Sequence, residues 1–343
     1  MTVPRRYYHC PGCGGSAPWD LWAGVGRRSL TPEARRLVVL AGESWSFDRA
    51  QSHLRELCHL HVSDDTIERV CQEEGISVQK WMKEAPQPVE AFTQAPGLVE
   101  FSTDGVKINT VDGWREMRIS VWAKREACLP CTPQQWDQRV LNEPTARLAI
   151  CAIAKSSLIG ASWQWFNSRL GLEDSDLSIL GDGARWIWSE SVKRFGSQAR
   201  WCLDIYHGSE HLHDCGKALF GEGQEARTWA DERLTCVLSH NGTGLIESLK
   251  QERATRPAEH HQPLDGLLGY LEENKDSMWY KDRLNEGLPI GSGLIEGACK
   301  NVIGARLKAN SARWRIRRAE RIGALRCLDY SGYWDLYWTN RAA

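Results

Sequence analysis

Two short apolar runs in this chain lead to Asp-Gly pairs, and this pattern predicts strands that carry acidic residues. Residues 98–105 alternate between apolar and polar positions and include Asp104, and a second alternating run, 114–122, follows closely. Alternation with a period of two is typical of half-buried strands, and a short gap between two such runs indicates a hairpin. Asp104 is therefore expected on the first strand of a hairpin.

The second Asp-Gly pair and a later glutamate extend the pattern. The apolar run at 177–181 breaks at Asp182, which is expected at the carboxyl end of a strand. In residues 288–300, Gly and Ser precede an apolar-periodic segment, so Glu296 is expected in the first turn or two of a helix. Strand ends and helix starts from distant parts of a chain can converge, and hard cations such as Mg²⁺ take several carboxylate oxygens. The three acids are therefore candidate ligands of a divalent metal.

Each of these acids also has an ordinary structural explanation. An isolated Asp-Gly pair is more often a turn than a metal site. Glu296 and Lys300 lie four residues apart, which is the spacing of a surface ion pair along a helix. The metal-site interpretation depends on the motifs occurring together.

A further motif lies between the second and third acids, where an apolar start at 201–203 leads to Asp204 and, three residues later, His207. The chain thereby resembles the DDE transposases of the Mutator-like group, which carry an Asp-x-x-His or Cys-x-x-His signature between the second Asp and the final Glu. The phrases at 181–188, 207–212 and 287–300 resemble in particular the ISKra family of bacterial insertion-sequence transposases. The resemblance runs from about Tyr7 to Trp338.

The resemblance implies an α/β, RNase H-like catalytic domain, a mixed sheet flanked by helices, in which Asp104, Asp182 and Glu296 hold two Mg²⁺ or Mn²⁺ ions. Such an enzyme promotes in-line attack on a DNA phosphodiester, first by water and then by the freed 3′-hydroxyl, so it cleaves and transfers strands at the ends of an insertion sequence. Asp204 and His207 accompany the three acids in the family and are expected to support the site. A buried, hydrogen-bonded structural histidine is the alternative for His207.

The spacing of the acids predicts an insertion within the catalytic domain. Asp182 and Glu296 are 114 residues apart, which is too far for one strand and one helix. The segment 210–286 consists mostly of helix-like stretches and resembles the helical insertion of Mutator-like enzymes. Within it, Trp229 is expected in the core, with contact to DNA bases as the alternative. The catalytic domain is then expected at 98–209 and 287–330, followed by a C-terminal tail at 331–343.

Residues 27–82 contain three helix-like stretches and predict a helix-turn-helix module, which in transposases recognises the terminal repeats. The first is expected to begin after Thr31 and to close at Gly42, and the third runs from Ser63 to Gly75. Residues 44–75 carry seven acids and three Arg, and this negative charge repels phosphate, so packing or dimerisation is the alternative role. The proline-containing segment 83–97 is expected to be a linker.

The N-terminal segment 1–26 contains a zinc knuckle of the Cys-x-x-Cys type at Cys10 and Cys13, with glycines on its turn. One knuckle supplies two ligands, and the next pair, Cys128 and Cys131, lies more than a hundred residues away. Family members often have more sequence before this point, so the resemblance implies an incomplete zinc ribbon. Zn²⁺ at Cys10 and Cys13 is a second metal to test beside Mg²⁺ or Mn²⁺.

Positive charge is concentrated after Glu296, although the net charge of the chain is −1. From Lys300 to Arg326 there are nine Lys or Arg and a single acid, Glu320. A solvated helix face is the usual explanation of a charged run, but acids do not interleave here, so a DNA-binding surface is favoured. Trp314 within the run can stack on a base or pack inward. The candidate DNA-binding residues are Lys300, Arg306, Lys308, Arg313, Arg315, Arg317 and Arg318.

Composition favours an intracellular enzyme of more than one domain. The 343 residues contain no stretch of eighteen apolar residues and no signal-peptide pattern. The twelve cysteines are scattered, which favours reduced thiols in cytoplasm. We therefore expect a cytoplasmic, nucleoid-associated protein that binds double-stranded DNA, namely terminal repeats and target, without membrane contact. Paired-end chemistry makes a homo-oligomer the expected state.

Two other function classes stay open. A domesticated or defective transposase keeps the fold as a DNA-binding regulator and does not cut. Another RNase H-like nuclease, such as a resolvase, shares the metal acids but needs neither the helical insertion nor the helix-turn-helix. A metal-independent hydrolase is disfavoured, because no Gly-x-Ser-x-Gly elbow stands out in the sequence.

Overall fold

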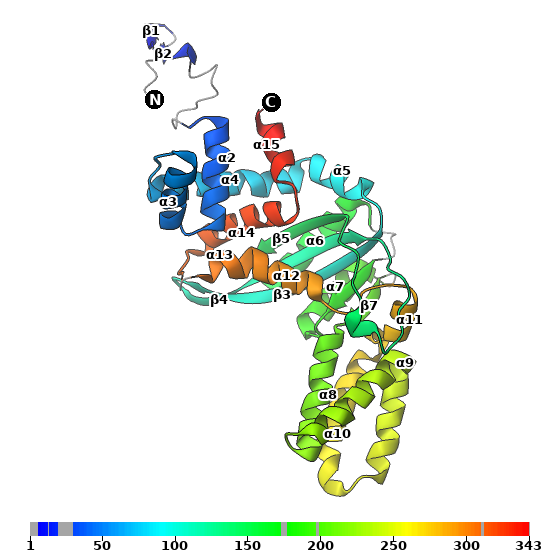
Figure 1. Cartoon of the computed structure of the whole chain (residues 1–343). Helices are drawn as coiled ribbons and strands as arrows, with labels where there is room; N and C mark the ends of the chain where they lie inside the picture. Colours follow the sequence, from blue (N-terminus) through cyan, green and yellow to red (C-terminus); the bar gives the residue numbers. More distant parts are fainter. Residues whose placement is uncertain are drawn as a thin grey trace.

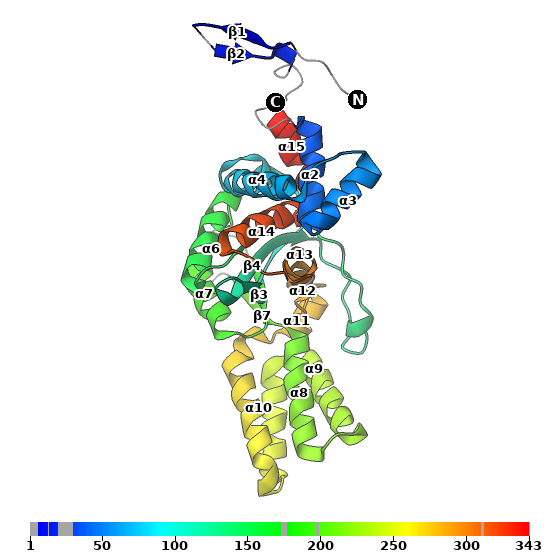
Figure 2. The same cartoon turned by 90° about the vertical axis from the view of Figure 1, so that its left-hand side faces the viewer.

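A five-stranded mixed sheet forms the centre of the computed structural model, with helices on both of its faces (Figures 1 and 2). The structure describes residues 6–12, 14–19, 30–172, 177–196, 199–309 and 312–342. The expected α/β class, with a mixed sheet flanked by helices, is confirmed. The strands follow the order β5 (Ala146–Ala152), β4 (Gly113–Arg125), β3 (Leu98–Thr110), β6 (Ser178–Gly181) and β7 (Arg200–Leu203).

Strands β3, β4 and β5 pair antiparallel, whereas β6 and β7 continue the sheet in parallel with β3. The predicted hairpin is confirmed as β3 and β4, and its first strand continues beyond Asp104 to Thr110. The parallel pairing aligns Ser102 of β3 with Leu180 of β6. Two residues further along both strands, Asp104 lies beside Asp182, because neighbouring parallel strands advance at the same rate.

Two helical layers cover the sheet. On one face, Phe101 of β3 packs against Trp163 and Phe195, with ring centroids 5.2 and 4.9 Å apart. The buried indole N–H of Trp163 donates to Ser120 Oγ at 2.7 Å. Alternate residues of a strand face opposite sides, so Asp104 faces the other layer. The first layer is α6 (Ser156–Leu170) and α7 (Arg185–Phe195), and the second is α12 (Gly293–Ala298), the π-helix η5 (Cys299–Gly304), α13 (Ala305–Leu307) and α14 (Ile316–Tyr330).

The three helices expected within residues 27–82 are present. Thr31 caps the first by accepting a hydrogen bond from Ala34 N at 3.2 Å, and Ser63 caps the third by accepting from Thr66 N at 3.3 Å. The third helix packs along α14 from the opposite end of the chain, so these helices share one core with the sheet. They are α2 (Pro32–Ser44), α3 (Phe47–Cys58) and α4 (Asp64–Glu84), and a small antiparallel pair, β1 (Tyr8–Cys10) and β2 (Gly14–Ser16), lies before them.

Two glycines that resemble helix ends lie inside helices. A Cβ on Gly75 would stand 2.6 Å from Arg321 Cβ and 2.7 Å from Arg321 O, so glycine allows α4 to approach α14 closely. A Cβ on Gly42 would stand 2.5 Å from Cys71 Sγ on α4. The prediction that the helices close at these positions is therefore wrong, because both glycines serve packing between helices.

The expected linker 83–97 and tail 331–343 are both structured. The linker contains α5 (Gln87–Gln94), whose Phe92 is fully buried in the main core. The tail contains α15 (Trp334–Ala342), which buries Tyr337 and Trp338 against the N-terminal helices. The boundaries drawn from prolines and chain position are thus wrong here, because apolar side chains in both segments complete the core.

Residues 205–285 form a further helical layer (Figure 1), and its core also includes Leu180 of β6 and Leu203 of β7. The prediction of a mostly helical insertion is confirmed, although its first helix begins at Ile205 rather than near residue 210. Trp229 is 4% exposed, so its expected place in the core is also confirmed. The helices are α8 (Ile205–Phe220), α9 (Gln224–Thr255), α10 (His261–Asn274) and α11 (Tyr280–Asn285). Among the described residues, no helix combines the length and apolar character needed to span a bilayer.

We expect Gly75→Ala to lower the free energy of unfolding by about 1–3 kcal/mol, because an added methyl overpacks the contact with α14. The matched control is Gly266→Ala on α10, where no atom lies within 4 Å of an added Cβ. Alanine there should raise the free energy of unfolding by about 0.5–1 kcal/mol through helix propensity. Urea denaturation of both variants measures the difference, and equal effects would contradict a tight contact at Gly75.

Candidate active site

Asp104 and Asp182 lie on neighbouring parallel strands at the same level of the sheet. Asp104 Oδ1 accepts from Gly105 N at 2.6 Å, and Asp182 Oδ1 accepts from Ala184 N at 2.9 Å, just before α7. Burial and the negative charge of Asp182 together raise the pKa of Asp104. The two carboxylates are therefore close enough to repel each other, and the predicted strand residue and the predicted strand-end residue both line one cavity.

Cys299, the first residue of η5, contacts this pair directly. Its Sγ donates to Asp104 Oδ2 at 3.6 Å. Burial and the charge of Asp104 raise the pKa of the Cys299 thiol, so the thiol stays protonated and remains a donor. The contact joins the strand that carries Asp104 to the helical segment that follows Glu296.

Glu296 lies on the short helix α12 and lines the same cavity as the two aspartates. Its Oε1 accepts from Lys300 Nζ at 2.6 Å, with the two side chains 62% and 72% exposed. The surface pair that the four-residue spacing suggested is thus present, and it forms at the mouth of the acidic cavity. Glu296 is brought to the site, but its carboxylate is held by lysine.

Asp204 is only 5% exposed, and its carboxylate connects the start of α8 to Ser292, the residue before α12. Its Oδ1 accepts from Tyr206 N at 3.1 Å, which caps α8, and from Ser292 N at 3.2 Å. Its Oδ2 accepts from Ser292 Oγ at 2.5 Å. Since Ser292 immediately precedes α12, this one carboxylate sets where the helix with Glu296 begins.

His207 lines the cavity one turn into α8. Its side chain is 44% exposed, and Nδ1 lies 3.9 Å from Glu210 Oε2. The alternative of a buried structural histidine is therefore wrong. Both expected supporting residues border the acids, but only Asp204 is buried and fully engaged by protein donors.

The cavity has a volume of about 500 Å³ and brings together the four acids and the one histidine that the sequence singled out. Two of the predicted basic residues, Lys300 and Lys308, also line it. Among its lining residues are Asp104, Asp182, Asp204, His207, Glu210, Ser292, Glu296, Cys299, Lys300 and Lys308.

The carboxylates of this cavity are the chemical type of ligand that hard divalent cations take. Two adjacent carboxylates, one with a raised pKa, are stabilised by a hard cation, which takes oxygen ligands. In the described part of the chain, however, no three His, Cys, Asp or Glu side chains are grouped so that they could hold a metal ion as they stand. Glu296 would have to leave Lys300 to join Asp104 and Asp182.

The zinc prediction falls largely outside the described structure. Cys13 lies outside the described residues, and Cys10 is exposed at the end of β1. Cys128 and Cys131 lie on the loop between β4 and β5, where their amides donate to Gly287 O at 3.0 Å and Leu284 O at 3.1 Å. Zinc at Cys10 and Cys13 stays a prediction.

The predicted basic surface divides into exposed and buried parts. Arg306 is 5% exposed, its Nε donates to Gly42 O at 3.1 Å, and its guanidinium lies over Phe47 and Trp314 at 4.8 and 4.9 Å. Its assignment to DNA is therefore wrong, because it is a core residue. Trp314 is 7% exposed, so it packs inward.

The remaining arginines lie on the surface on either side of the buried Trp314. Arg315 and Arg317 are exposed, whereas Arg318 pairs with Glu68 of α4 and Arg313 donates to the carbonyls of Thr110 and Val111. Arg315 and Arg317 are thus exposed members of the predicted surface to which none of these contacts belongs.

Sequence reasoning missed three residues at the site. Tyr206 lines the cavity, and Ser292 donates to Asp204. Tyr270 of α10 stacks on His211 with ring centroids 3.7 Å apart, and its hydroxyl lies 3.6 Å from where a Cβ of Gly183 would stand. Burial and the charges of nearby acids raise the pKa of Tyr270, so its hydroxyl stays protonated. The position of Ser292 in a Gly-Ser-Gly segment at the start of a helix could have marked it as a helix cap. The place of Tyr270 could not be predicted, because it depends on how the helices of the insertion pack against the sheet.

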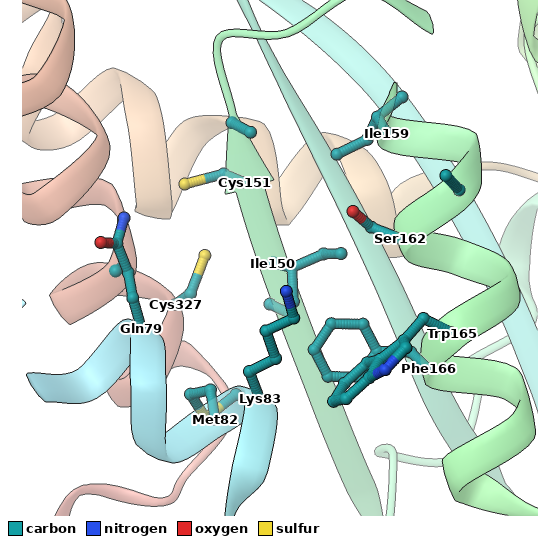
Figure 3. Close-up of a pocket in the computed structure, with 14 residues that line it drawn as sticks. Gln79, Met82, Lys83, Ile150, Cys151, Ile159, Ser162, Trp165, Phe166 and Cys327 are labelled. Atoms are coloured by element: carbon teal, nitrogen blue, oxygen red, sulfur yellow. The ribbon is translucent and has the colours of Figure 1, made fainter. Parts of the chain in front are cut away.

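A second cavity, of about 450 Å³, opens at the edge strand β5 between α4, α6 and α14 (Figure 3). Its walls include Ile150, Trp165, Phe166 and Cys327, and its lining contains no carboxylate. The acidic cavity is therefore the candidate active site. No family model matches the chain, and no curated protein matches it.

We expect Asp204→Ala to lower the free energy of unfolding by about 2 kcal/mol or more, because three donors would lose a buried acceptor. Amide hydrogen exchange across residues 290–298 should speed up at the same time. The control is Glu210→Ala on the same helix, whose carboxylate is 72% exposed and whose loss should change stability by less than about 0.5 kcal/mol. Unchanged exchange at 290–298 in Asp204→Ala would contradict the tie between α8 and α12.

Proposed function

We propose that this protein is a DDE transposase that cleaves DNA strands and transfers them at the ends of an insertion sequence. The observation that carries the proposal is the convergence of Asp104, Asp182 and Glu296 on one cavity from a strand, a strand end and a helix. The chain also resembles ISKra-family transposases in its motifs.

The sheet topology supports an RNase H-like catalytic domain. If β3 to β7 are counted as strands 1 to 5, their order across the sheet is 3-2-1-4-5. Strands 1, 2 and 3 pair antiparallel, and strands 4 and 5 run parallel to strand 1. The RNase H-like fold has this strand order, and its acidic residues lie on the first strand and after the fourth, as Asp104 and Asp182 do. Fold alone does not define function, so the acids carry the argument.

Asp104, Asp182 and Glu296 are the residues that would hold Mg²⁺ or Mn²⁺. Bound there, such ions would activate an attacking oxygen and stabilise the leaving oxygen of a phosphodiester. Lys300 and Lys308 supply positive charge to a phosphate at the mouth of the cavity. Asp204 and Ser292 act indirectly, by holding the start of α12.

Double-stranded DNA is the proposed partner, and a homo-oligomer is the proposed assembly for joining two ends. The exposed Arg315 and Arg317 extend the basic surface beyond the cavity. The acids of the N-terminal helices are partly neutralised inside the protein, since Glu68 pairs with Arg318 and Glu74 accepts from Arg35 Nε at 2.6 Å. This weakens the objection that these helices repel phosphate.

The second candidate function is a transposase-derived DNA-binding protein that does not cut. The Glu296–Lys300 pair at 2.6 Å favours it, because it keeps the third carboxylate engaged without metal. Another RNase H-like nuclease would cleave but produce no joined strands.

The first test is Mg²⁺- or Mn²⁺-dependent cleavage and joining of DNA that carries the flanking terminal repeats. We expect both products with the parent protein and their loss in Asp182→Asn, by a factor of about a hundred or more, because one carboxylate ligand is removed. Glu247→Gln on α9, an exposed acid outside the cavity, is the matched control and should retain activity. Product gels with end-labelled DNA measure both reactions.

The outcomes separate the three candidates. Binding without cleavage in any metal supports the non-cutting protein. Nicking without joined products supports another nuclease. Cleavage that persists in Asp182→Asn would contradict the assigned acids.

The basic surface generates a separate prediction. We expect Arg315→Ala combined with Arg317→Ala to weaken DNA binding at every sequence tested and to reduce the slope of log affinity against log salt by up to about two. Lys250→Ala in the insertion, 53% exposed, is the control and should leave the slope unchanged. Fluorescence anisotropy across a salt series measures both, and an unchanged slope in the double variant would remove these arginines from the interface.

A further inference from the structure

Tyr206 exposes its ring at the wall of the acidic cavity. It lies two residues after Asp204 and is 56% exposed. On one side the ring packs against the backbone of Gly291, where an added Cβ would stand 2.8 Å from a ring carbon. Glycine at 291 therefore lets a large aromatic surface lie close to the carboxylates.

Trp136 lies beside Tyr206 from a different part of the chain. The ring centroids are 5.6 Å apart and the ring planes are inclined by 50°. Trp136 opens a short 3-10 turn (Trp136–Gln138) in the long loop between β4 and β5. Tyr206 of the cavity wall is thus backed by the half-buried ring of Trp136 from a separate element.

The loop that carries Trp136 is fixed on both sides of the ring. Before it, Cys128 N and Cys131 N donate to the carbonyls of Gly287 and Leu284 at 3.0 and 3.1 Å. After it, Arg139 Nη2 donates to Leu288 O at 2.8 Å. The same 284–288 segment leads on to Ser292 and α12. Trp136 is therefore held relative to the acids by backbone contacts.

We propose that Tyr206 and Trp136 form a stacking platform for one unpaired nucleotide base next to the scissile phosphate. This inference rests on the proposed function and specifies its substrate as DNA with a base outside the duplex stack. Aromatic side chains bind single-stranded bases of any sequence through their π-faces. Bases inside a duplex already have both faces covered, so the exposed Tyr206 ring beside the carboxylates, with Trp136 next to it, favours a base that has left the stack.

The charge around the rings agrees with this substrate. Lys300 and Lys308 line the cavity and can meet the phosphates that flank the base. Tyr206 contributes only its backbone N–H to the cap on Asp204, so the side chain can be replaced without removing that hydrogen bond. The platform and the tie to α12 are therefore separable by mutation.

The test uses the full chain and two DNA probes of the same arbitrary sequence, without divalent metal so that no strand is cut. One probe is a blunt duplex, and the other ends in a single unpaired 2-aminopurine, whose fluorescence falls when it stacks on an aromatic ring. We expect tighter binding of the tailed probe and quenching of its fluorescence. Tyr206→Ala should weaken binding of the tailed probe roughly tenfold or more and remove the quenching, while leaving the blunt duplex unchanged.

Three further variants make the result specific. Tyr206→Phe keeps the ring and should keep both the preference and the quenching. Trp136→Ala should reduce the quenching. Trp279 lies outside the cavity and is 45% exposed, so Trp279→Ala is the control and should not change the quenching. Thermal unfolding of each variant checks that the fold is retained.

Other outcomes overturn the inference and show which part fails. If the protein binds both probes equally and Tyr206→Ala changes neither, the platform is wrong but a DNA-binding function stands. If the protein binds neither probe, the platform is wrong, and the cleavage assay with terminal-repeat DNA decides the proposed function separately.

Discussion

The buried carboxylate of Asp204 is the contact on which the geometry of the acidic cavity depends. Helix α12 continues directly through η5 into α13, and Glu296 lies near the amino end of this helical segment, so its position depends on what holds that end. Asp204 accepts from Ser292 at the amino end, and Tyr330 Oη donates to Leu294 O at 3.1 Å. In addition, Ile205 N donates to Ile290 O at 3.0 Å. The end of β7, the start of the insertion and the start of α12 are therefore fixed together.

That arrangement concentrates negative charge, and the protein balances it locally. Asp104 and Asp182 lie side by side, and the raised pKa of Asp104 reflects burial and this repulsion. The protonated thiol of Cys299 donates to Asp104, and Lys300 neutralises Glu296. Each contact offsets part of the cost of grouping acids. Under the proposed function, a cation takes over this balancing role and leaves Lys300 able to meet a phosphate.

Local patterns predicted the elements that carry the acids, because period-two alternation and Asp-Gly breaks report directly on strands and their ends. They failed where tertiary packing decides. Gly75 has the sequence signature of a helix end, yet it lies mid-helix because Arg321 packs on it. The prolines of 83–97 suggested a linker, but Phe92 fills the core. Arg306 looked like a DNA contact, since a charged residue in a basic run gives no sign that aromatic rings will enclose it.

Acidic residues are concentrated in the N-terminal helices and basic residues in the C-terminal part of the chain, and the structure explains this distribution. The acidic N-terminal helices and the basic C-terminal helix lie against each other, and Glu43 and Glu68 pair with Arg326 and Arg318 across that contact. Burial raises the pKa of Glu43 even though Arg326 lies beside it, so the arginine offsets only part of the cost of burying the carboxylate. Counting charges in 44–75 suggested repulsion of DNA, but part of that charge is used in packing. The packing role accounts for these acids directly, and any DNA recognition by these helices must use the surface that α14 leaves uncovered.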